Sequence, residues 1–172
     1  MKWIKLFTSI IYLIVVCLLK YFGANINLFV DIILMFPICI YFVLLIHEIT
    51  HFSVFALYKI PITELCIGLF RIRKYEGRFV FGFKNHGVFS GYCSFKPQEN
   101  KLKEIVAALM SGGISGAIIS IISLILLLVN IENQINPFFF GLFFSGTYSL
   151  YTTLLRKNSA DRITITKLLR GK

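Results

Sequence analysis

The sequence predicts an all-α membrane protein: a bundle of four transmembrane helices with a small membrane-associated β-sheet between helices 2 and 3. Hydrophobic residues make up 57% of the 172 residues, above the roughly 45–50% of soluble domains. Four apolar stretches, at residues 3–22, 26–58, 105–129 and 137–155, reach the length of about 20 residues that spans a bilayer. Basic residues gather in the connections between these stretches, which is typical of membrane topology signals.

The first apolar stretch looks at first like a secretory signal peptide, because Lys2 and Lys5 precede it. Its apolar run is longer than that of a signal peptide, and no small-x-small cleavage pattern follows it. We therefore interpret residues 1–25 as a retained, additional N-terminal helix. Residues 1–172 are expected to form a single membrane-embedded domain.

Residues 61–97 separate the second and third spans and have a strand-like pattern. A strand over residues 78–83 (RFVFGF) places Phe79, Phe81 and Phe83 on one face, and turn-forming residues stand at 76–77 and 85–87. This pattern predicts a small amphipathic sheet at the membrane surface. We interpret the phenylalanine stripe as its buried or lipid-facing side. A second interpretation is that an edge strand pairs with an unwound peptide substrate.

The basic residues also predict the orientation of the spans. The first loop has one basic residue, Lys20, the segment 59–103 has nine, the third loop at 130–136 has none, and the tail 156–172 has six. This alternation places both termini in the cytosol. The net charge of +10 therefore indicates contact with a lipid bilayer, not with nucleic acid.

The second span contains the sequence HEITH at residues 47–51, which is an HExxH motif. On a helix, His47 and His51 face the same way and can bind one metal ion, while Glu48 can take a proton from water. Each ionisable group costs about 3 kcal/mol to insert into a bilayer, which argues against a chance match of three within five residues. The motif predicts a Zn²⁺ site with two histidine ligands and Glu48 as the catalytic base.

A catalytic zinc site usually has a third protein ligand, and the extended HExxHxxGxxH pattern is absent because Val54 and Tyr58 occupy its positions. Asp161 directly follows the fourth span, on the same predicted side of the membrane as the motif. We predict Asp161 as the third ligand, with Glu64 as the alternative. The chain must then unwind or turn after about residue 155.

The third span contains a GxxxG pattern formed by Gly112 and Gly116, with Ser111 and Ser115 beside it. Small residues at this spacing let membrane helices approach closely. The pattern predicts that the third helix packs against the second one beside the metal.

These motifs resemble the site-2 protease family of intramembrane zinc metalloproteases. Residues 108–116 (ALMSGGISG) are similar to the family's small-residue motif in the next core helix. Residues 153–161 (TLLRKNSAD) have the spacing of its asparagine-to-aspartate-glycine motif, whose aspartate is the third zinc ligand. Residues 90–92 (SGY) are similar to the glycine-tyrosine element of its membrane-associated strands. The chain departs from the family pattern at Gly113 (usually Pro), Gly116 and Thr153 (usually Asn), and Arg162 (usually Gly).

The resemblance implies that residues 26–168 form a catalytic core without a PDZ or CBS domain, in a multi-pass protein of the bacterial cell membrane. It implies a zinc endopeptidase that cuts a membrane-spanning or signal-peptide-like substrate near the cytosolic face. Two other functions stay open. Arg162 is compatible with a non-catalytic membrane module of the same family, acting as an immunity or peptide-export partner. A metal transporter would need more polar residues than Asp31 and the HExxH cluster provide.

Overall fold

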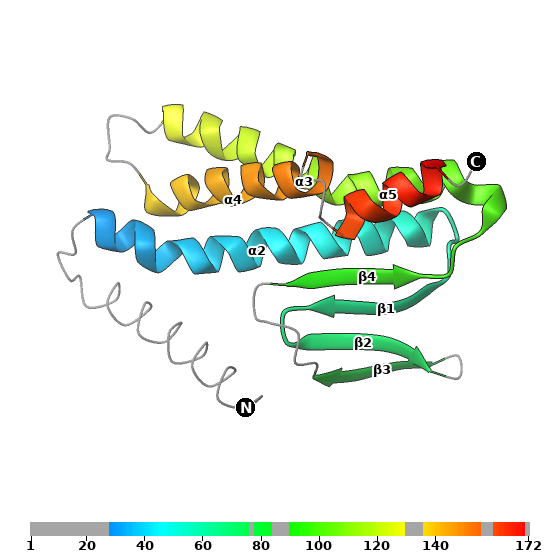
Figure 1. The fold of residues 1–172 in the computed structure, drawn as a ribbon. Helices are drawn as coiled ribbons and strands as arrows, with labels where there is room; N and C mark the ends of the chain where they lie inside the picture. Colours follow the sequence, from blue (N-terminus) through cyan, green and yellow to red (C-terminus); the bar gives the residue numbers. More distant parts are fainter. Residues whose placement is uncertain (1–27, 76–77, 84–89, 130–135, 156–159, 171–172) are drawn as a thin grey trace.

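The computed structural model describes residues 28–75, 78–83, 90–129, 136–155 and 160–170. Three helices, α2 (Leu28–Leu57), α3 (Leu102–Val129) and α4 (Pro137–Leu154), lie side by side, and a sheet extends along the second half of α2 (Figure 1). The sheet consists of β1 (Ile62–Ile67), β2 (Phe70–Tyr75), β3 (Arg78–Phe83) and β4 (Gly91–Phe95). A short 3-10 helix (Glu99–Lys101) leads into α3, and α5 (Ala160–Arg170) follows α4.

The helices α2 and α3 contain segments of 25 and 28 residues that are long and apolar enough to cross a membrane. Helix α4 begins at Pro137, a position that tolerates proline because its backbone N–H would have no partner inside the helix. The side chain of Asn136 caps this helix by accepting a hydrogen bond of 3.0 Å from the backbone nitrogen of Phe138. Helix α4 has 18 residues and does not meet the same test for a membrane span.

Small residues allow α3 and α4 to pack closely. A Cβ atom added to Gly116 would lie 2.8 Å from the backbone oxygen of Gly146, and one added to Gly146 would lie 2.5 Å from the backbone oxygen of Gly116. Larger residues could not occupy these positions without separating the helices. The close approach predicted from the GxxxG pattern is confirmed, although the partner at Gly116 is α4.

The sheet has the strand order β3-β2-β1-β4, and every neighbouring pair is antiparallel. Strand β3 has the bounds expected from the phenylalanine alternation, and Phe79, Phe81 and Phe83 are all exposed. The stripe is therefore not buried in the protein, and its contact with lipid remains a prediction. Strand β4 is the edge strand that lies next to α2 (Figure 1).

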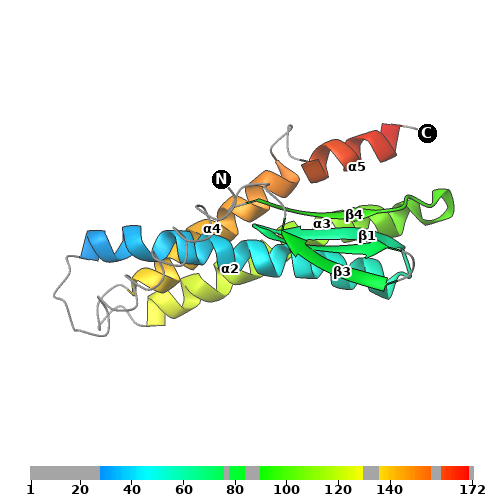
Figure 2. The same ribbon diagram turned by 90° about the horizontal axis from the view of Figure 1, so that it is seen from below.

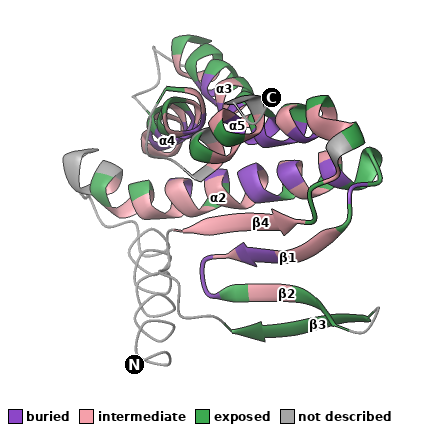
Figure 3. Ribbon diagram, turned by 45° about the vertical axis from the view of Figure 1, so that its right-hand side comes forward, coloured by how far each residue is buried: buried purple, intermediate pink, exposed green. Residues whose placement is uncertain are grey.

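Helix α5 is an element that the sequence analysis did not predict. Its buried residue Ile165 packs in one cluster with Phe55 of α2 and Ile105 of α3, so α5 lies at the same end of the bundle as the sheet (Figure 2). Burial is concentrated where α2, α3 and α4 pack against one another, while β3 is exposed along its length (Figure 3).

A mostly helical fold with a small antiparallel sheet between the second and third predicted spans is confirmed. The predicted N-terminal span, residues 1–25, lies outside the described residues. The four-span bundle, the single domain and the cytosolic position of both termini remain predictions.

Candidate metal centre

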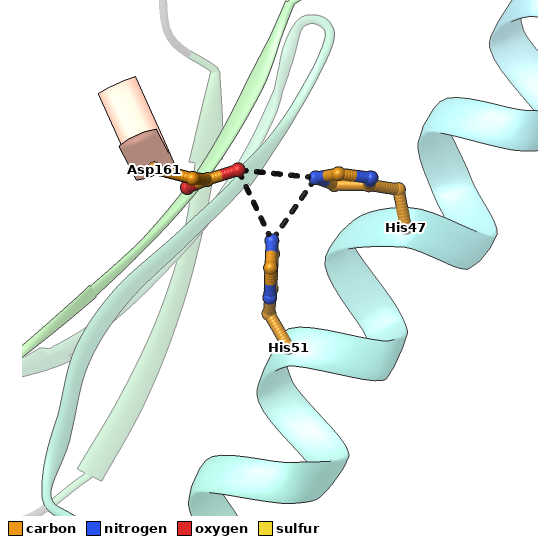
Figure 4. Close-up of side chains that lie close together, drawn as sticks. All are labelled: His47, His51 and Asp161. Carbon is orange, nitrogen blue, oxygen red and sulfur yellow. Dashed lines mark hydrogen bonds and ion pairs between the residues drawn. The ribbon is translucent and has the colours of Figure 1, made fainter. Parts of the chain in front are cut away.

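The two histidines of the HExxH motif lie one helical turn apart on α2 and are both buried. Their rings meet edge to face, with centroids 4.5 Å apart. The Nε2 atoms of His47 and His51 are 3.0 Å apart and point toward the same place (Figure 4). The local spacing of the motif accounts for this arrangement, since residues four apart share one helix face.

Asp161 completes a triangle with the two imidazoles. Its Oδ2 atom lies 3.4 Å from Nε2 of His47 and 3.5 Å from Nε2 of His51 (Figure 4). The carboxylate comes from the first turn of α5, and the buried Ile165, one turn further along the same helix face, anchors that helix in the core. The backbone of residues 156–159, where the sequence analysis expected the turn, lies outside the described residues.

The charge of Asp161 also suits a cation site. Burial raises the pKa of this carboxyl group, but when the imidazoles are protonated at Nε2 their hydrogen bonds to Asp161 and their positive charge outweigh burial and hold the pKa below its usual range. The group is therefore ionised at neutral pH. A carboxylate at the N-terminal end of a helix is further stabilised by the helix dipole.

Hydrogen bonds at the far side of each ring direct the histidine lone pairs into the triangle. Nδ1 of His51 lies 2.7 Å from the backbone oxygen of Ala108, which can only accept, so Nδ1 carries the proton. Nδ1 of His47 lies 2.9 Å from the hydroxyl oxygen of Ser149, which can accept a hydrogen bond in the same way. When the imidazoles are neutral, each Nε2 atom then presents a lone pair, as a metal-binding imidazole does.

The triangle has the size and the donor set of a zinc site. Nitrogen and oxygen ligands at about 2.0–2.2 Å from zinc, at tetrahedral angles, are about 3.3–3.6 Å from one another. The three separations here are 3.0, 3.4 and 3.5 Å. Two lone pairs and a carboxylate oxygen at these distances repel one another, and a cation at their centre removes that repulsion. Among the described residues, these three form the group that could hold a metal ion.

Two glycines make room for the cluster. A Cβ atom added to Gly112 would lie 2.6 Å from Nε2 of both His47 and His51, so α3 passes directly against the rings. A Cβ atom added to Gly91 of β4 would lie 2.6 Å from Cγ and Oε1 of Glu48. The helix α3 and the strand β4 thus both press against the motif through residues without side chains.

Glu48 is buried beside the histidines, with 3% of its surface exposed. Within the part of the chain that the structure describes, its Oε2 atom has no hydrogen-bond partner. A buried carboxylate oxygen without a partner is energetically costly, and such groups are often kept for a chemical task.

The alternative third ligand, Glu64, is engaged elsewhere. Its carboxylate accepts a hydrogen bond of 2.7 Å from Arg71 and another from the hydroxyl group of Tyr92. The cluster of potential metal ligands contains Asp161 and not Glu64. The sequence analysis missed Ser149, whose contact with His47 depends on the packing of α4 against α2 and has no local sequence signal.

Thr153, which stands where the site-2 protease motif usually has asparagine, is buried and donates a hydrogen bond of 3.0 Å to the backbone oxygen of Ser149. Its side chain also lies against Gly113, where a Cβ atom would be 2.9 Å from Cβ of Thr153. Two of the departures from the family pattern, at 113 and 153, therefore contact each other. The threonine and glycine form one packed contact between α3 and α4.

Comparison with protein-family models identifies one family. Residues 35–169 match the model of peptidase family M50, and this range includes the HExxH motif, the sheet and Asp161. Comparisons with curated proteins and with solved structures found no match. The family match spans well over half of the 172 residues. The chain therefore belongs to peptidase family M50, the site-2 protease family of membrane metalloproteases.

Proposed function

We propose that this protein is a zinc-dependent intramembrane endopeptidase in which His47, His51 and Asp161 hold the metal and Glu48 is the catalytic base. The observation that carries the proposal is the triangle of Nε2, Nε2 and Oδ2 atoms, with sides of 3.0, 3.4 and 3.5 Å, beside a buried carboxylate. Membership of the M50 family supports the same chemistry.

Each of these residues has a separate role in the proposed reaction. His47, His51 and Asp161 would hold a zinc ion, whose Lewis-acid chemistry would polarise the scissile carbonyl group and make water a better nucleophile at neutral pH. The Oε2 atom of Glu48, which has no partner among the described residues, is suited to take a proton from the attacking water and pass it to the leaving amine. Ser149 and the carbonyl group of Ala108 hold the two imidazoles in the tautomer that binds metal.

The substrate is expected to be a membrane-spanning or signal-peptide-like segment. A helical peptide bond is shielded by its own hydrogen bonds, so the segment must be extended when it is cut. Strand β4 supports this step, because it is an edge strand and its Gly91 lies against Glu48. An extended substrate that pairs with the outer edge of β4 would run close to the catalytic carboxylate.

The test compares the wild-type protein with Glu48→Gln, both purified and reconstituted in bilayers with a library of single-pass model peptides. Mass spectrometry of the products detects cleavage. We expect the wild type to cut at least one peptide inside its apolar segment, and Glu48→Gln to retain zinc and lose cleavage. A Glu48→Gln protein that still cleaves would show that another group activates the water.

Zinc content and zinc transport, measured on the same reconstituted protein, distinguish a protease from a non-catalytic module and from a metal transporter. Zinc bound by a wild-type protein that cleaves nothing across the library would favour a non-catalytic module. Zinc that crosses the bilayer of sealed vesicles would favour a transporter. Substitution of His47 by alanine serves as the control, because it should remove both zinc and cleavage.

A further inference from the structure

The β2–β3 hairpin carries most of its exposed phenylalanines toward one end and its exposed cations toward the other. The register pairs Phe70 with Phe83 at one end and Tyr75 with Arg78 at the other. Phe70, Phe81 and Phe83, which we call the aromatic end of the hairpin, have 53–77% of their surface exposed. Phe79 is exposed as well but lies opposite Lys74, toward the other end. Arg73, Lys74 and Arg78 are exposed as well. We call Arg73, Lys74 and Arg78 the basic end of the hairpin.

The basic end lies level with the C-terminal end of α2. Helix α2 ends at Leu57 and β1 begins at Ile62, so the start of β1 lies near that end (Figure 1). Strand β1 then runs back along α2, and its Glu64 is in register with Arg73. The end of the hairpin at which Tyr75 pairs with Arg78 therefore lies on the same side as the C-terminus of α2.

The aromatic end lies further back along α2, level with the HExxH motif but separated from it by β1 and β4. Ile67, at the end of β1, is in register with both Phe70 and Gly91, and Gly91 lies against Glu48. Glu48 is nine residues, or about 14 Å, before the end of α2. It stands within the candidate membrane span, Ile33–Leu57. A bilayer around this span also surrounds the aromatic end.

The pairing of charges agrees with this difference in depth. Arg71 is the one basic residue of the strands near the aromatic end, and its guanidinium group forms an ion pair of 2.7 Å with Glu64. Glu64 is the single acidic residue within the four strands. Charged groups inside a membrane are paired because an isolated charge is costly there. The three cations of the basic end are exposed and outnumber the acidic groups near them.

We propose that the β2–β3 hairpin is a lipid-binding element that places its phenylalanine end among the acyl chains and binds anionic phospholipid headgroups with Arg73, Lys74 and Arg78. Aromatic residues next to cations are typical of elements that lie in a membrane interface. Each cation near an anionic membrane surface contributes attraction to it. Neither the zinc site nor proteolysis is required for this binding.

The first test measures depth with a single fluorescent residue. The full-length protein with Trp3→Phe, which removes its one tryptophan, receives either Phe81→Trp or, as the matched control at the other end, Tyr75→Trp. Each variant is reconstituted in vesicles of phosphatidylcholine and phosphatidylglycerol whose acyl chains carry bromine. We expect quenching by deep bromine atoms for the reporter at 81 and by aqueous iodide for the reporter at 75. Iodide access to the reporter at 81 would overturn the proposal.

The second test measures the choice of lipid. Arg73→Gln with Arg78→Gln is compared with Lys103→Gln and Lys167→Gln, a pair that removes the same charge from exposed positions outside the sheet. Spin-labelled phosphatidylglycerol and phosphatidylcholine report the relative affinity for each lipid. We expect the hairpin pair to lose up to about fivefold of the anionic preference for each removed charge, and the control pair to lose much less. Equal losses would contradict the proposal.

Binding of a protein partner to the same surface would give a different quenching result. If the reporter at 81 is reached by iodide in vesicles and becomes shielded only when a membrane peptide is added, the hairpin is a docking surface for protein. That result would also overturn the lipid proposal.

Discussion

The substitution Gly112→Ala tests the packing of α3 against the metal centre. The new Cβ atom would lie 2.6 Å from Cε1 and Nε2 of His47 and from Nε2 of His51. Ordinary contacts begin near 3.4 Å, so the rings or the helix must move by about 0.8 Å. Ligand distances in a metal site are held to about 0.2 Å, and this displacement is several times larger.

The effect on zinc and the effect on folding should differ in size. Alanine stabilises a helix by about 1 kcal/mol relative to glycine, and overpacking costs about 1–3 kcal/mol. We therefore expect a loss of about 0–2 kcal/mol in the free energy of unfolding. Disturbing the partners of metal ligands costs about 10–100-fold in affinity. Moving the ligands themselves should cost at least about 100-fold.

Competition with a chelator measures the zinc affinity, and thermal unfolding in detergent measures the stability. The matched control is Gly82→Ala in β3, where an added Cβ atom meets nothing within 4 Å, and its zinc affinity should equal that of the wild type. If Gly112→Ala also binds zinc with wild-type affinity, the two rings do not bind the metal in the arrangement described.

Ser149→Ala removes the hydroxyl group that contacts the imidazole of His47 at 2.9 Å, and zinc affinity, measured by chelator competition, should fall about 10–100-fold. Glu64→Gln should keep full zinc occupancy by elemental analysis, because Glu64 is paired with Arg71; lost zinc would restore Glu64 as a ligand. A reporter fused after Lys172 should behave as cytosolic and one inserted near Glu132 as external, and the opposite pattern would overturn the predicted topology.

Local patterns were sufficient for the parts of the fold that depend on neighbouring residues. The spacing of His47 and His51 places both rings on one helix face whatever surrounds the helix. The alternation of phenylalanines from Phe79 to Phe83 predicted a strand with the bounds observed. In both cases the regular backbone geometry alone determines which side chains lie together.

Long-range packing determined the positions of Asp161 and Ser149, which local sequence patterns do not specify. Asp161 reaches the histidines because α5 is anchored by Ile165 against Phe55 and Ile105, and nothing near Asp161 in the sequence specifies those partners. The contact between Ser149 and His47 joins residues 102 positions apart. The pattern of Ile165 and Leu168, both packed in the same core cluster, is a helical signal that could have indicated α5.

X-ray absorption spectroscopy of the zinc in the purified protein tests the central claim most directly. We predict one zinc per chain, with two imidazole nitrogens at about 2.0–2.1 Å and one carboxylate oxygen at about 2.0–2.2 Å. The Asp161→Asn protein should lose zinc or the carboxylate oxygen from its spectrum. A sulfur ligand in the wild-type spectrum, or an unchanged spectrum and full occupancy in Asp161→Asn, would contradict the assignment of His47, His51 and Asp161 as the metal site.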